Sequence, residues 1–528
     1  MAKINRREFL AAAAQAASAA ALSGSAPGKR RIGLVHSTHA RLARPASPED
    51  PLDDGRVRDM VWKAIEYAGG FEDRIRPGSW VVIKPNIVFL RPQSGYTSGD
   101  VTDLRVTRAV LEYVARKAPA ARVTIAEGGS YRSLRDPAED NVVSQNSARV
   151  DATTFDWGDK EFPGAGGTLN SLLRDMATRF PGKTYDYVDL NYDGVKDASG
   201  RLRRVEVPVS RTGVKAFGAR PDYFVTNTIR KCDFLITVPV MKVHEQCGIT
   251  ASMKSYVGTA PRLGYAVPGK FWNVNLHEQH SVENRIDPFI IDLASFHPPD
   301  FTVVDGIRGL QYTEHNNDRP DQMIRSNLVM ASVDPVGADA LAAQLMGFNP
   351  WDIDFLHLAQ MREMGRRDLA EFDILGDDPG KLRRRWAKPR RWYGRNNREW
   401  RVTKNPEAPM ETWERYTAPT DVLRFARWAP GTSFAAAVRV QAEGHRKAFL
   451  WVGARGRFTA LLNGARVMEQ ENLTQFRVGQ FQQAVELRPG ENLLVFRVQA
   501  EAVPAQISAL LVGPRNDGDT VEGIRWVA

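Results

Sequence analysis

Short runs of apolar and β-branched residues alternate with segments of helical periodicity between residues 31 and 346. The runs are apolar on both faces, which is typical of buried parallel strands covered by helices. They are Arg31–His36, Trp80–Lys84, Arg122–Ala126, Asp233–Val238, Phe301–Val304 and Asn327–Ala331, and the helical segments include Val57–Ala68, Leu104–Arg116, Arg285–Leu293 and Pro335–Met346. This alternation predicts an α/β domain with a parallel-rich, doubly wound sheet and helices on both faces.

From about residue 412 the pattern changes to alternating apolar and polar positions, punctuated by turns at Asn463-Gly464 and Pro489-Gly490. This period of two predicts an antiparallel β-sandwich. The Leu-Asn-Gly hairpin followed by VELRPGENLLVFRV resembles the galactose-binding-like jelly roll that is often joined to secreted glycan-active enzymes. The resemblance leaves two roles open for this module, a glycan partner or a structural support.

The length of 528 residues exceeds that of one ordinary domain. Hydrophobic residues make up 43% of the chain and charged residues 25%, which excludes a disordered or collagen-like protein. We predict four parts: a signal segment over 1–28, the α/β domain over 29–380, a basic aromatic linker over 381–411 and the sandwich over 412–528.

The N-terminal sequence has the features of an export signal. Asn5-Arg6-Arg7-Glu8-Phe9-Leu10 precedes an Ala-rich stretch that ends near Ala26, the pattern of a twin-arginine signal. The alternative is a basic N-terminal helix. No later run approaches the roughly 18 uninterrupted apolar residues that a membrane span needs. We therefore expect a periplasmic or secreted protein without a transmembrane span in its mature chain.

Basic residues are concentrated in one segment. Between Lys381 and Arg401 the sequence holds two Lys and eight Arg against one acidic residue, Glu399, so this stretch accounts for +9 of the net charge of +10. Interleaved aromatic residues suit contact with bases or a membrane surface. Because export separates the protein from nucleic acid, we expect no nucleic-acid partner. Three interpretations stay open: a strap between two domains, a contact with anionic lipid or polysaccharide, and a solvated surface.

The two cysteines, Cys232 and Cys247, limit the cofactors. They are too few for a four-cysteine zinc site or iron–sulfur cluster. After export they are able to form a disulfide, but we expect a buried thiol at Cys232. The sequence leaves a bound metal and the oligomeric state undetermined.

Charged or polar residues follow each of the six apolar runs. In an open parallel sheet ligands bind outside the carboxyl ends of the strands, so we expect these side chains to meet in one cleft. We assign His244, Lys242 and Lys254 as catalytic candidates. The ligand-binding candidates are Lys84, Asn86, Glu127, Gly128, Thr250, Asp305 and Asp334.

Six blocks of sequence occur between Arg31 and Gly376 in a characteristic order: VVIKPNIV, VTDLRVTRAVLEYV, VTIAEGGS, DFLITVPVMKVHEQCGITASMKSYVG, FTVVDGIRGL and SVDPVGADALAAQLMGF. In order and spacing they resemble the family catalogued as domain of unknown function 362. The resemblance implies motif positions at Lys84, Asn86, Lys242, His244, Thr250, Lys254, Asp334 and Asp339. Some relatives carry an iron–sulfur module, whose cysteines this chain lacks. The family implies a fold and a site but no particular reaction.

The residue types at this edge suit an anionic ligand. Lysine ammonium groups bind carboxylates or phosphates, and the Gly128-Gly129 turn is able to present backbone N–H groups to an anion. His244 beside several lysines is expected to be a neutral general base or a metal ligand. The alternative is a structural ion network in which Lys84 and Lys242 pair with Glu127, Asp305 and Asp334.

Two further patterns resemble metal sites. His277-Glu278-Gln279-His280 places two imidazoles three residues apart, which differs from the zinc-protease spacing. Asp189-Leu190-Asn191-Tyr192-Asp193-Gly194 imitates the start of a calcium loop, but Gly200 occupies the position that requires Glu, so we expect a turn.

The leading hypothesis is an exported enzyme that acts on a small anionic, sugar-derived substrate at the carboxyl edge of the sheet. Lysines together with a neutral histidine favour proton abstraction next to a carboxylate over nucleophilic acyl transfer. A non-catalytic periplasmic binding protein for an anion or glycan, and a metal-dependent hydrolase or lyase, are the alternatives.

Overall fold

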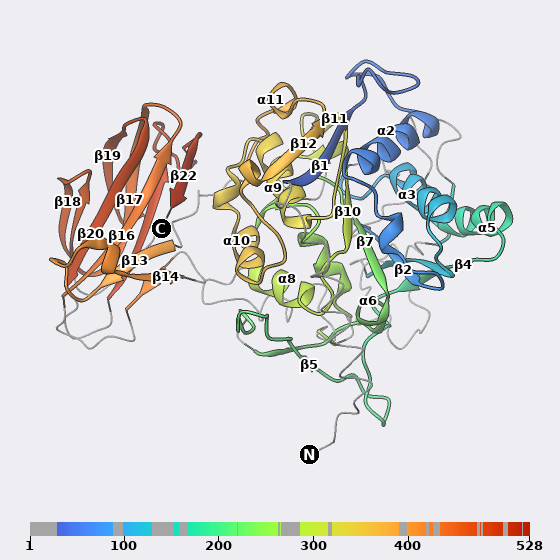
Figure 1. Cartoon of the computed structure of the whole chain (residues 1–528), viewed down its shortest axis with the longest axis horizontal. Helices are drawn as coiled ribbons and strands as arrows, with labels where there is room; N and C mark the ends of the chain where they lie inside the picture. The colour runs from blue at the N-terminus through green and yellow to red at the C-terminus, as the bar shows by residue number, and fades with distance from the viewer. Residues whose placement is uncertain are drawn as a thin grey trace.

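The computed structural model describes the two predicted folded parts of the chain, with gaps (Figure 1). The described residues are 29–87, 99–128, 153–157, 167–218, 220–261, 264–265, 286–314, 319–389, 399–418, 422–425, 433–472, 476, 479–499, 505–519 and 521–527. The predicted signal segment, Gly129 and the His277–His280 motif lie outside them. No helix within these ranges is long and apolar enough to cross a membrane.

An eight-stranded sheet lies at the centre of the first domain, with the strand order β12-β1-β11-β10-β7-β2-β3-β4 (Figure 1). Its strands are β1 (Arg30–His36), β2 (Trp80–Pro85), β3 (Arg122–Glu127), β4 (Thr184–Asp189), β7 (Phe234–Val238), β10 (Phe301–Leu310), β11 (Met323–Ser332) and β12 (Phe372–Gly376). Two short hairpins accompany it, β5 (Val205–Glu206) with β6 (Asp222–Tyr223) and β8 (Lys242–His244) with β9 (Gly248–Thr250). The sheet supports the predicted α/β class.

The sheet is mixed, because β11 runs antiparallel to both of its neighbours, β1 and β10. The other adjacent pairs are parallel. A parallel return requires a crossover of a dozen or more residues, usually helical. Residues 311–322 join β10 to β11 as a hairpin instead: Gln311 N–H donates to the Gln322 carbonyl at 2.9 Å, and the described residues of the segment contain no helix. The sixth apolar run therefore enters the sheet in the opposite direction to the other five.

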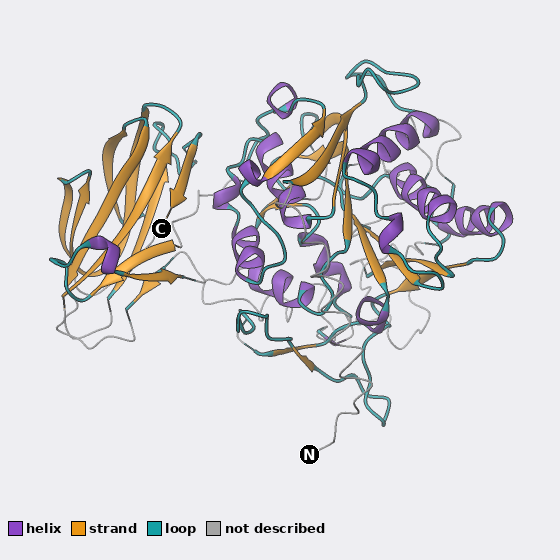
Figure 2. Ribbon diagram, viewed as in Figure 1, coloured by secondary structure: helices purple, strands orange, loops and turns teal. Residues whose placement is uncertain are grey.

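Helices cover both faces of this sheet (Figure 2). Alternate strand residues enter two separate cores, as Leu34 and Val35 of β1 do. One core includes α2 (Asp54–Tyr67), α3 (Leu104–Lys117) and α5 (Leu169–Arg179), and the other includes α8 (Asp287–Ala294), α9 (Pro335–Leu345) and α10 (Asp354–Met361). Shorter helices are α6 (Asn227–Lys231) and α11 (Pro379–Leu382).

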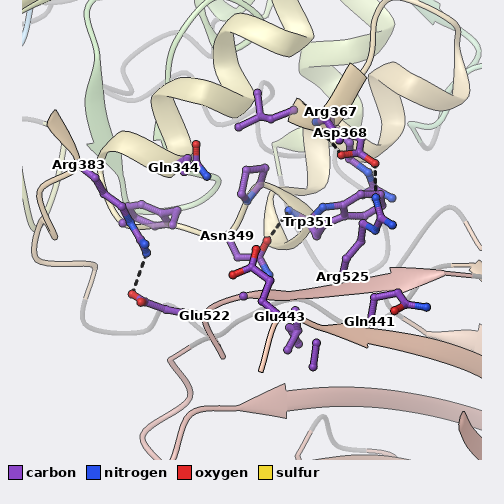
Figure 3. Close-up of a pocket in the computed structure, with 18 residues that line it drawn as sticks. Gln344, Asn349, Trp351, Arg367, Asp368, Arg383, Gln441, Glu443, Glu522 and Arg525 are labelled. Carbon is purple, nitrogen blue, oxygen red and sulfur yellow. Dashed lines mark hydrogen bonds and ion pairs between the residues drawn. The ribbon is translucent and has the colours of Figure 1, made fainter. Parts of the chain in front are cut away.

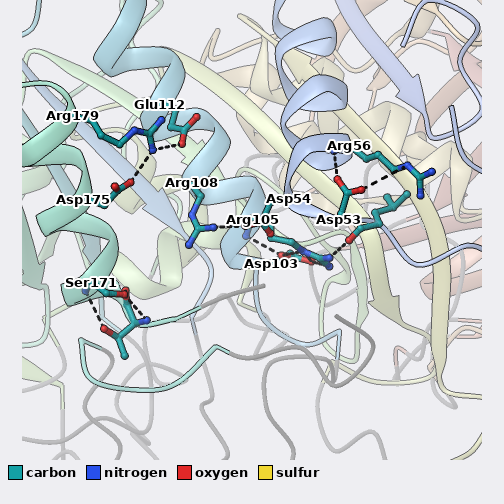
Figure 4. Close-up of polar contacts among 12 residues, drawn as sticks. Asp53, Asp54, Arg56, Asp103, Arg105, Arg108, Glu112, Ser171, Asp175 and Arg179 are labelled. Carbon is teal, nitrogen blue, oxygen red and sulfur yellow. Dashed lines mark hydrogen bonds and ion pairs between the residues drawn. The ribbon is translucent and has the colours of Figure 1, made fainter. Parts of the chain in front are cut away.

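Ion pairs reinforce the first helical layer (Figure 4). Arg108 of α3 pairs with Asp54 at the start of α2. Arg179 of α5 contacts Glu112 of α3 at 2.8 Å and Asp175 of its own helix at 2.7 Å. These contacts join the three helices on the side of the sheet away from α9.

The C-terminal domain is a separate antiparallel sheet curled around one apolar core (Figure 2). β17 pairs with β19 and β21 through its first half and with β18 and β20 through its second half. Asn463 and Gly464 both have positive φ, at 53° and 82°, as the predicted two-residue turn requires. The strands are β13 (Glu399–Thr403), β14 (Glu414–Thr417), β15 (Leu423–Arg424), β16 (Ser433–Ala442), β17 (Arg446–Leu462), β18 (Ala465–Asn472), β19 (Phe481–Leu487), β20 (Gly490–Gln499), β21 (Gln506–Val512) and β22 (Ile524–Val527).

The described part of the basic segment lies between the two domains. Trp386 is buried in the core beside α9, and its backbone N–H donates to the carbonyl of Met346. Arg385 and Lys388 pair with Asp519 of the C-terminal domain. These residues therefore form a strap, the first of the three interpretations. β13 also pairs with β16, so the C-terminal sheet begins within the segment that the sequence assigned to the linker.

Candidate functional site

A buried ion pair lies where β2 and β3 end. Lys84 Nζ is 2.8 Å from Glu127 Oε2, and the two side chains are 0% and 3% exposed. The Glu127 carboxylate also accepts the backbone N–H groups of Ile87 at 3.2 Å and Gly128 at 2.9 Å. A buried charge needs such compensation because removal from water costs several kcal/mol per ion. The pair therefore fixes the ends of two neighbouring strands.

The short helix η2 (Lys254–Thr259) passes directly over this pair. A Cβ atom on Gly258 would lie 1.9 Å from Glu127 Oε1 and 3.0 Å from Lys84 Nζ. A Cβ atom on Gly128 would lie 2.7 Å from the Gly258 carbonyl oxygen. The two glycines let the backbone close over the charges, which brings Lys254 to the same edge of the sheet.

The end of β2 is tied to the start of α3. The backbone N–H of Asn86 donates to Thr102 Oγ1, and Thr102 Oγ1 donates to the carbonyl of Val238. The side-chain amide of Asn86 makes no hydrogen bond to a described residue, although Asn86 is only 8% exposed. This amide therefore keeps its donors and acceptor available at the edge.

Asp305 is a second buried carboxylate at this edge. Its two oxygens accept the backbone N–H groups of Asp103 and Ile307 at 2.8 and 2.9 Å. Burial and the negative charge of Asp103 raise the pKa of Asp305 to about 7. Although burial opposes it, the cations Arg105 and Arg308 hold the pKa of Asp103 below its usual value. Asp305 is thus able to change protonation near neutral pH.

Lys242, His244 and Glu314 form a connected group. Lys242 Nζ donates to the backbone carbonyls of Asp100 at 2.6 Å and Glu314 at 2.9 Å. His244 Nε2 lies 3.4 Å from Glu314 Oε1, and His244 Nδ1 accepts the backbone N–H of Gln246 at 3.1 Å. Because Nδ1 accepts that hydrogen bond, the imidazole proton lies on Nε2 and faces the Glu314 carboxylate.

Thr250 stands beside Lys242 in the β8–β9 hairpin. Its hydroxyl is buried and has no hydrogen-bond partner within the described part of the chain. Lys254, four residues further on, is half-buried and makes no side-chain hydrogen bond or ion pair with any residue that the structure describes. Both side chains retain unused hydrogen-bonding capacity.

The structure brings most of the candidate residues to one edge of the sheet but places Asp334 at the other. Asp334 accepts the backbone N–H of Gly337 at the start of α9 and pairs with Arg30 at the start of β1. The reversed direction of β11 is the cause, since the residues after this strand emerge at the opposite edge. We therefore remove Asp334 from the ligand-binding set.

Asp339 has a structural role. Its carboxylate accepts the backbone N–H groups of Ser252 and Met253 at 2.7 and 2.8 Å. Burial raises the pKa of Asp339 to about 8. This residue fixes the segment between Thr250 and Lys254 against α9.

The predicted ion network is present in part. Lys84 pairs with Glu127, as that interpretation expected, whereas Lys242 donates to backbone carbonyls. The sequence analysis did not identify Glu314 or Asp103 as site residues. It predicted a strand that ends at Val304, whereas β10 continues through an irregularity after Gly306 to Leu310, and the chain then leads to Glu314. The only signal for Glu314 is its position ten residues after the first apolar run of that strand.

The calcium-like segment forms a turn, as expected. Asp189 Oδ1 accepts the backbone N–H of Asn191, and Asp193 Oδ2 accepts that of Thr228. Within the described ranges no group of three or more His, Cys, Asp or Glu side chains is placed to hold a metal ion. Cys232 and Cys247 are both free and buried.

The opposite edge of the sheet carries a cysteine, a histidine and an aspartate in contact. Cys232 Sγ is 3.7 Å from His297 Nδ1, and His297 Nε2 is 3.0 Å from Asp300 Oδ2. Burial lowers the pKa of His297, but the hydrogen bonds to Asp300 and Cys232 outweigh it and raise the pKa to about 10 from 6.5. His297 is therefore a cation in the folded protein at neutral pH.

This cluster predicts a loss of stability in alkaline solution. A histidine whose pKa is higher in the folded state stabilises the fold fully below its unfolded pKa of 6.5, and this contribution is lost as the pH rises through about 10. We expect urea denaturation to show a decrease of about 2–4 kcal/mol between pH 7 and 10. His297→Gln should flatten that dependence, and an unchanged slope in the variant would contradict the assignment.

Comparison with known proteins gives one family and distant structural similarities. No curated protein matches the chain. The lactate racemase apoprotein from Thermoanaerobacterium thermosaccharolyticum is 12% identical with a TM-score of 0.28, over 55% of this chain and 55% of its own, so the chain spans about half of its length. A family 35 carbohydrate binding module from an environmental isolate is 16% identical with a TM-score of 0.14, over 19% of this chain and 73% of its own.

A GH2 beta-galacturonidase from Eisenbergiella tayi is 12% identical with a TM-score of 0.16, over 21% of this chain and 23% of its own. TM-scores this low do not establish a shared fold. The family model described as domain of unknown function (DUF362) matches residues 191–344, which include Lys242, His244, Thr250 and Lys254. That match supports the DUF362 family, to which the sequence motifs already pointed.

Proposed function

We propose that the protein is an exported enzyme that binds a small anionic, sugar-derived substrate at the carboxyl edge of the α/β sheet and transfers a proton on it. The observation that carries this proposal is the buried Thr250 hydroxyl, which has no hydrogen-bond partner among the described residues and lies near the Asn86 amide and the Lys254 ammonium. Buried polar groups are nearly always satisfied, so an unpartnered hydroxyl favours a ligand.

Lys254 and Lys242 would supply the positive charge for the substrate anion. Both lie close to Thr250 along the β8–β9–η2 segment, and Asn86 adds an amide from the end of β2. In this proposal the Lys84–Glu127 pair supports the site and does not contact substrate, since η2 closes over it. Lys254 therefore takes the ligand-binding role that the sequence analysis assigned to Lys84.

The His244–Glu314 pair would move the proton. The hydrogen bond from Gln246 to Nδ1 favours a neutral imidazole with its proton on Nε2, so His244 is oriented as a donor. The carboxylate of Glu314 is the better base, because Nδ1 of His244 already accepts the backbone N–H of Gln246. Glu314 would take a proton from the carbon next to the substrate carboxylate and later return a proton to that carbon, while the Nε2–H of His244 holds the Glu314 carboxylate in position.

Proton exchange with solvent tests this assignment without knowledge of the product. The protein is incubated in D₂O with a panel of sugar acids, sugar phosphates and small carboxylates, and loss of a C–H signal is followed by NMR. We expect Glu314→Gln to lower the exchange rate by about 100-fold or more, the usual contribution of a general base, with substrate affinity nearly unchanged. Thr250→Val should weaken binding and leave the exchange rate of the bound substrate unchanged.

Glu66→Gln is the matched control, since Glu66 is an exposed glutamate of α2 that pairs with Lys63 and is not among the site residues. It should exchange at the parent rate. Tight calorimetric binding of a panel member without exchange would instead favour the non-catalytic binding protein. Release of bound metal by His244→Gln would favour the metal-dependent hydrolase or lyase.

Two assignments from sequence complete the proposal. Residues 1–28 would be a twin-arginine signal that sends the protein to the periplasm or outside the cell. The C-terminal sheet would be a galactose-binding-like jelly roll. The alternating strands and the Asn463-Gly464 hairpin support the second assignment.

A further inference from the structure

A polar cleft lies between the α/β domain and the C-terminal sheet (Figure 3). None of the candidate residues at the carboxyl edge lines it. Its volume of about 540 Å³ falls within the range of roughly 300–1,000 Å³ for small-molecule sites, which occur preferentially at domain interfaces. One wall comes from the end of α9, the short helix η4 (Pro350–Asp352) and the segment before β12, and the other comes from β16 and β22.

Two ion pairs join the walls on opposite sides of the cleft (Figure 3). Arg383 contacts Glu522 at 2.9 Å on one side, and Arg525 contacts Asp368 at 2.7 Å on the other. With the strap residues Arg385 and Lys388, these pairs hold the two domains together. The cleft is therefore preformed, which lowers the entropic cost of binding a ligand.

An aromatic ring lies in the wall between these pairs. Trp351 is half-buried in η4, and its backbone N–H donates to the side chain of Asn349 at 3.1 Å. The guanidinium of Arg367 lies 4.2 Å from the Trp351 ring centroid, and Arg367 also pairs with Glu399 of β13 at 3.6 Å. These contacts fix the ring as a rigid apolar surface.

The remaining lining is polar and balanced in charge. Three arginines and three acidic residues contribute, so the formal charges cancel: Arg367, Arg383, Arg525, Asp368, Glu443 and Glu522. Gln344, Asn349 and Gln441 add amides that both donate and accept. A ligand with many hydroxyl groups suits this mixture, because each hydroxyl also donates and accepts. A charged ligand would find no net charge of opposite sign.

We propose that this interdomain cleft binds a neutral oligosaccharide. The C–H face of one sugar ring lies against Trp351, and its hydroxyl groups bond to the amides and charged groups around it. An aromatic surface with convergent polar groups is the general form of an orienting small-molecule site. The site is separate from the proposed catalytic edge, so the glycan would position the protein or a longer substrate.

Calorimetric titration of the full chain with xylohexaose, cellohexaose, laminarihexaose and hexagalacturonate tests the proposal. We expect at least one of the three neutral hexasaccharides to bind. Trp351→Ala and Gln441→Ala should each weaken that binding, the first by about tenfold or more, as truncation of a central aromatic contact does. Circular dichroism should show that both variants stay folded.

Trp62→Ala is the matched control. Trp62 is a half-buried tryptophan of α2 with an arginine over its ring, Arg58 at 5.7 Å, and it is not part of the cleft. Its removal should leave the affinity unchanged. The proposal is overturned if no neutral hexasaccharide binds, if hexagalacturonate alone binds, or if binding survives both cleft substitutions.

Discussion

Replacing Lys84 with methionine is expected to destabilise the protein by about 3–5 kcal/mol, because it leaves the Glu127 carboxylate buried without its counter-ion. Methionine preserves most of the side-chain volume, so the loss reports charge and not packing. Chemical denaturation followed by circular dichroism measures it. A change of this size would identify Lys84 as a structural residue.

A double-mutant cycle separates the pair from its surroundings. Glu127→Gln in the Lys84→Met background removes the buried negative charge and keeps an oxygen for the backbone N–H groups of Ile87 or Gly128. The double variant should therefore be more stable than Lys84→Met alone. Lys63→Met is the control, because the exposed Lys63–Glu66 pair should contribute less than about 0.5 kcal/mol. A Lys84→Met protein of normal stability that no longer binds anions would return Lys84 to the ligand site.

Substitution of Gly258 by alanine is expected to be nearly as damaging. The added methyl group would lie 1.9 Å from Glu127 Oε1, so either η2 or the buried ion pair must move. Overpacking of this kind costs about 3 kcal/mol or more when the neighbours cannot yield. Thermal unfolding should show a large decrease in Tm, together with a loss of any proton-exchange activity.

Gly55→Ala provides the comparison. Its added methyl group would meet the end of the Arg44 side chain, at 2.6 Å from Nη2, and that side chain is 55% exposed and free to move aside. We expect a change of no more than about 0.5 kcal/mol. Equal effects at Gly55 and Gly258 would show that the close approach of η2 to the pair has no energetic importance.

The periodicity of the chain predicted the strands of the α/β domain better than their directions. Six apolar runs identify β1, β2, β3, β7, β10 and β11, because a strand buried on both faces is apolar along most of its length. The same pattern cannot distinguish a parallel from an antiparallel neighbour, so the direction of β11 and the position of Asp334 were wrong. β4 was missed because it lies at the sheet edge and its residues, such as Asp186, are polar.

The sequence predicted the site residues that directly follow apolar strands, but it did not predict those that other parts of the fold bring to the site. Lys84 and Glu127 follow apolar runs and pair where their strands end, as the rule for parallel sheets leads one to expect. Glu314 and Asp103 reach the edge through a strand extension and a helix N-cap, which only the folded backbone defines. Whether a lysine meets a carboxylate or a carbonyl is likewise a property of the fold, as the different partners of Lys84 and Lys242 illustrate.

The place of β1 in the sheet has a consequence for the order in which the chain assembles during synthesis. β1 is made before the other strands of this sheet, yet it pairs with β11 and β12, which are made about 300 residues later. β2, β3 and β4 are able to pair with one another much earlier, because only 86–121 and 128–183 separate them along the chain. Contacts between such distant segments form late, because a long loop must close before they stabilise anything. A nascent chain that ends before Phe372 lacks β12, so one edge of β1 has no neighbouring strand. Nearly the whole α/β domain must therefore be synthesised before its sheet is complete.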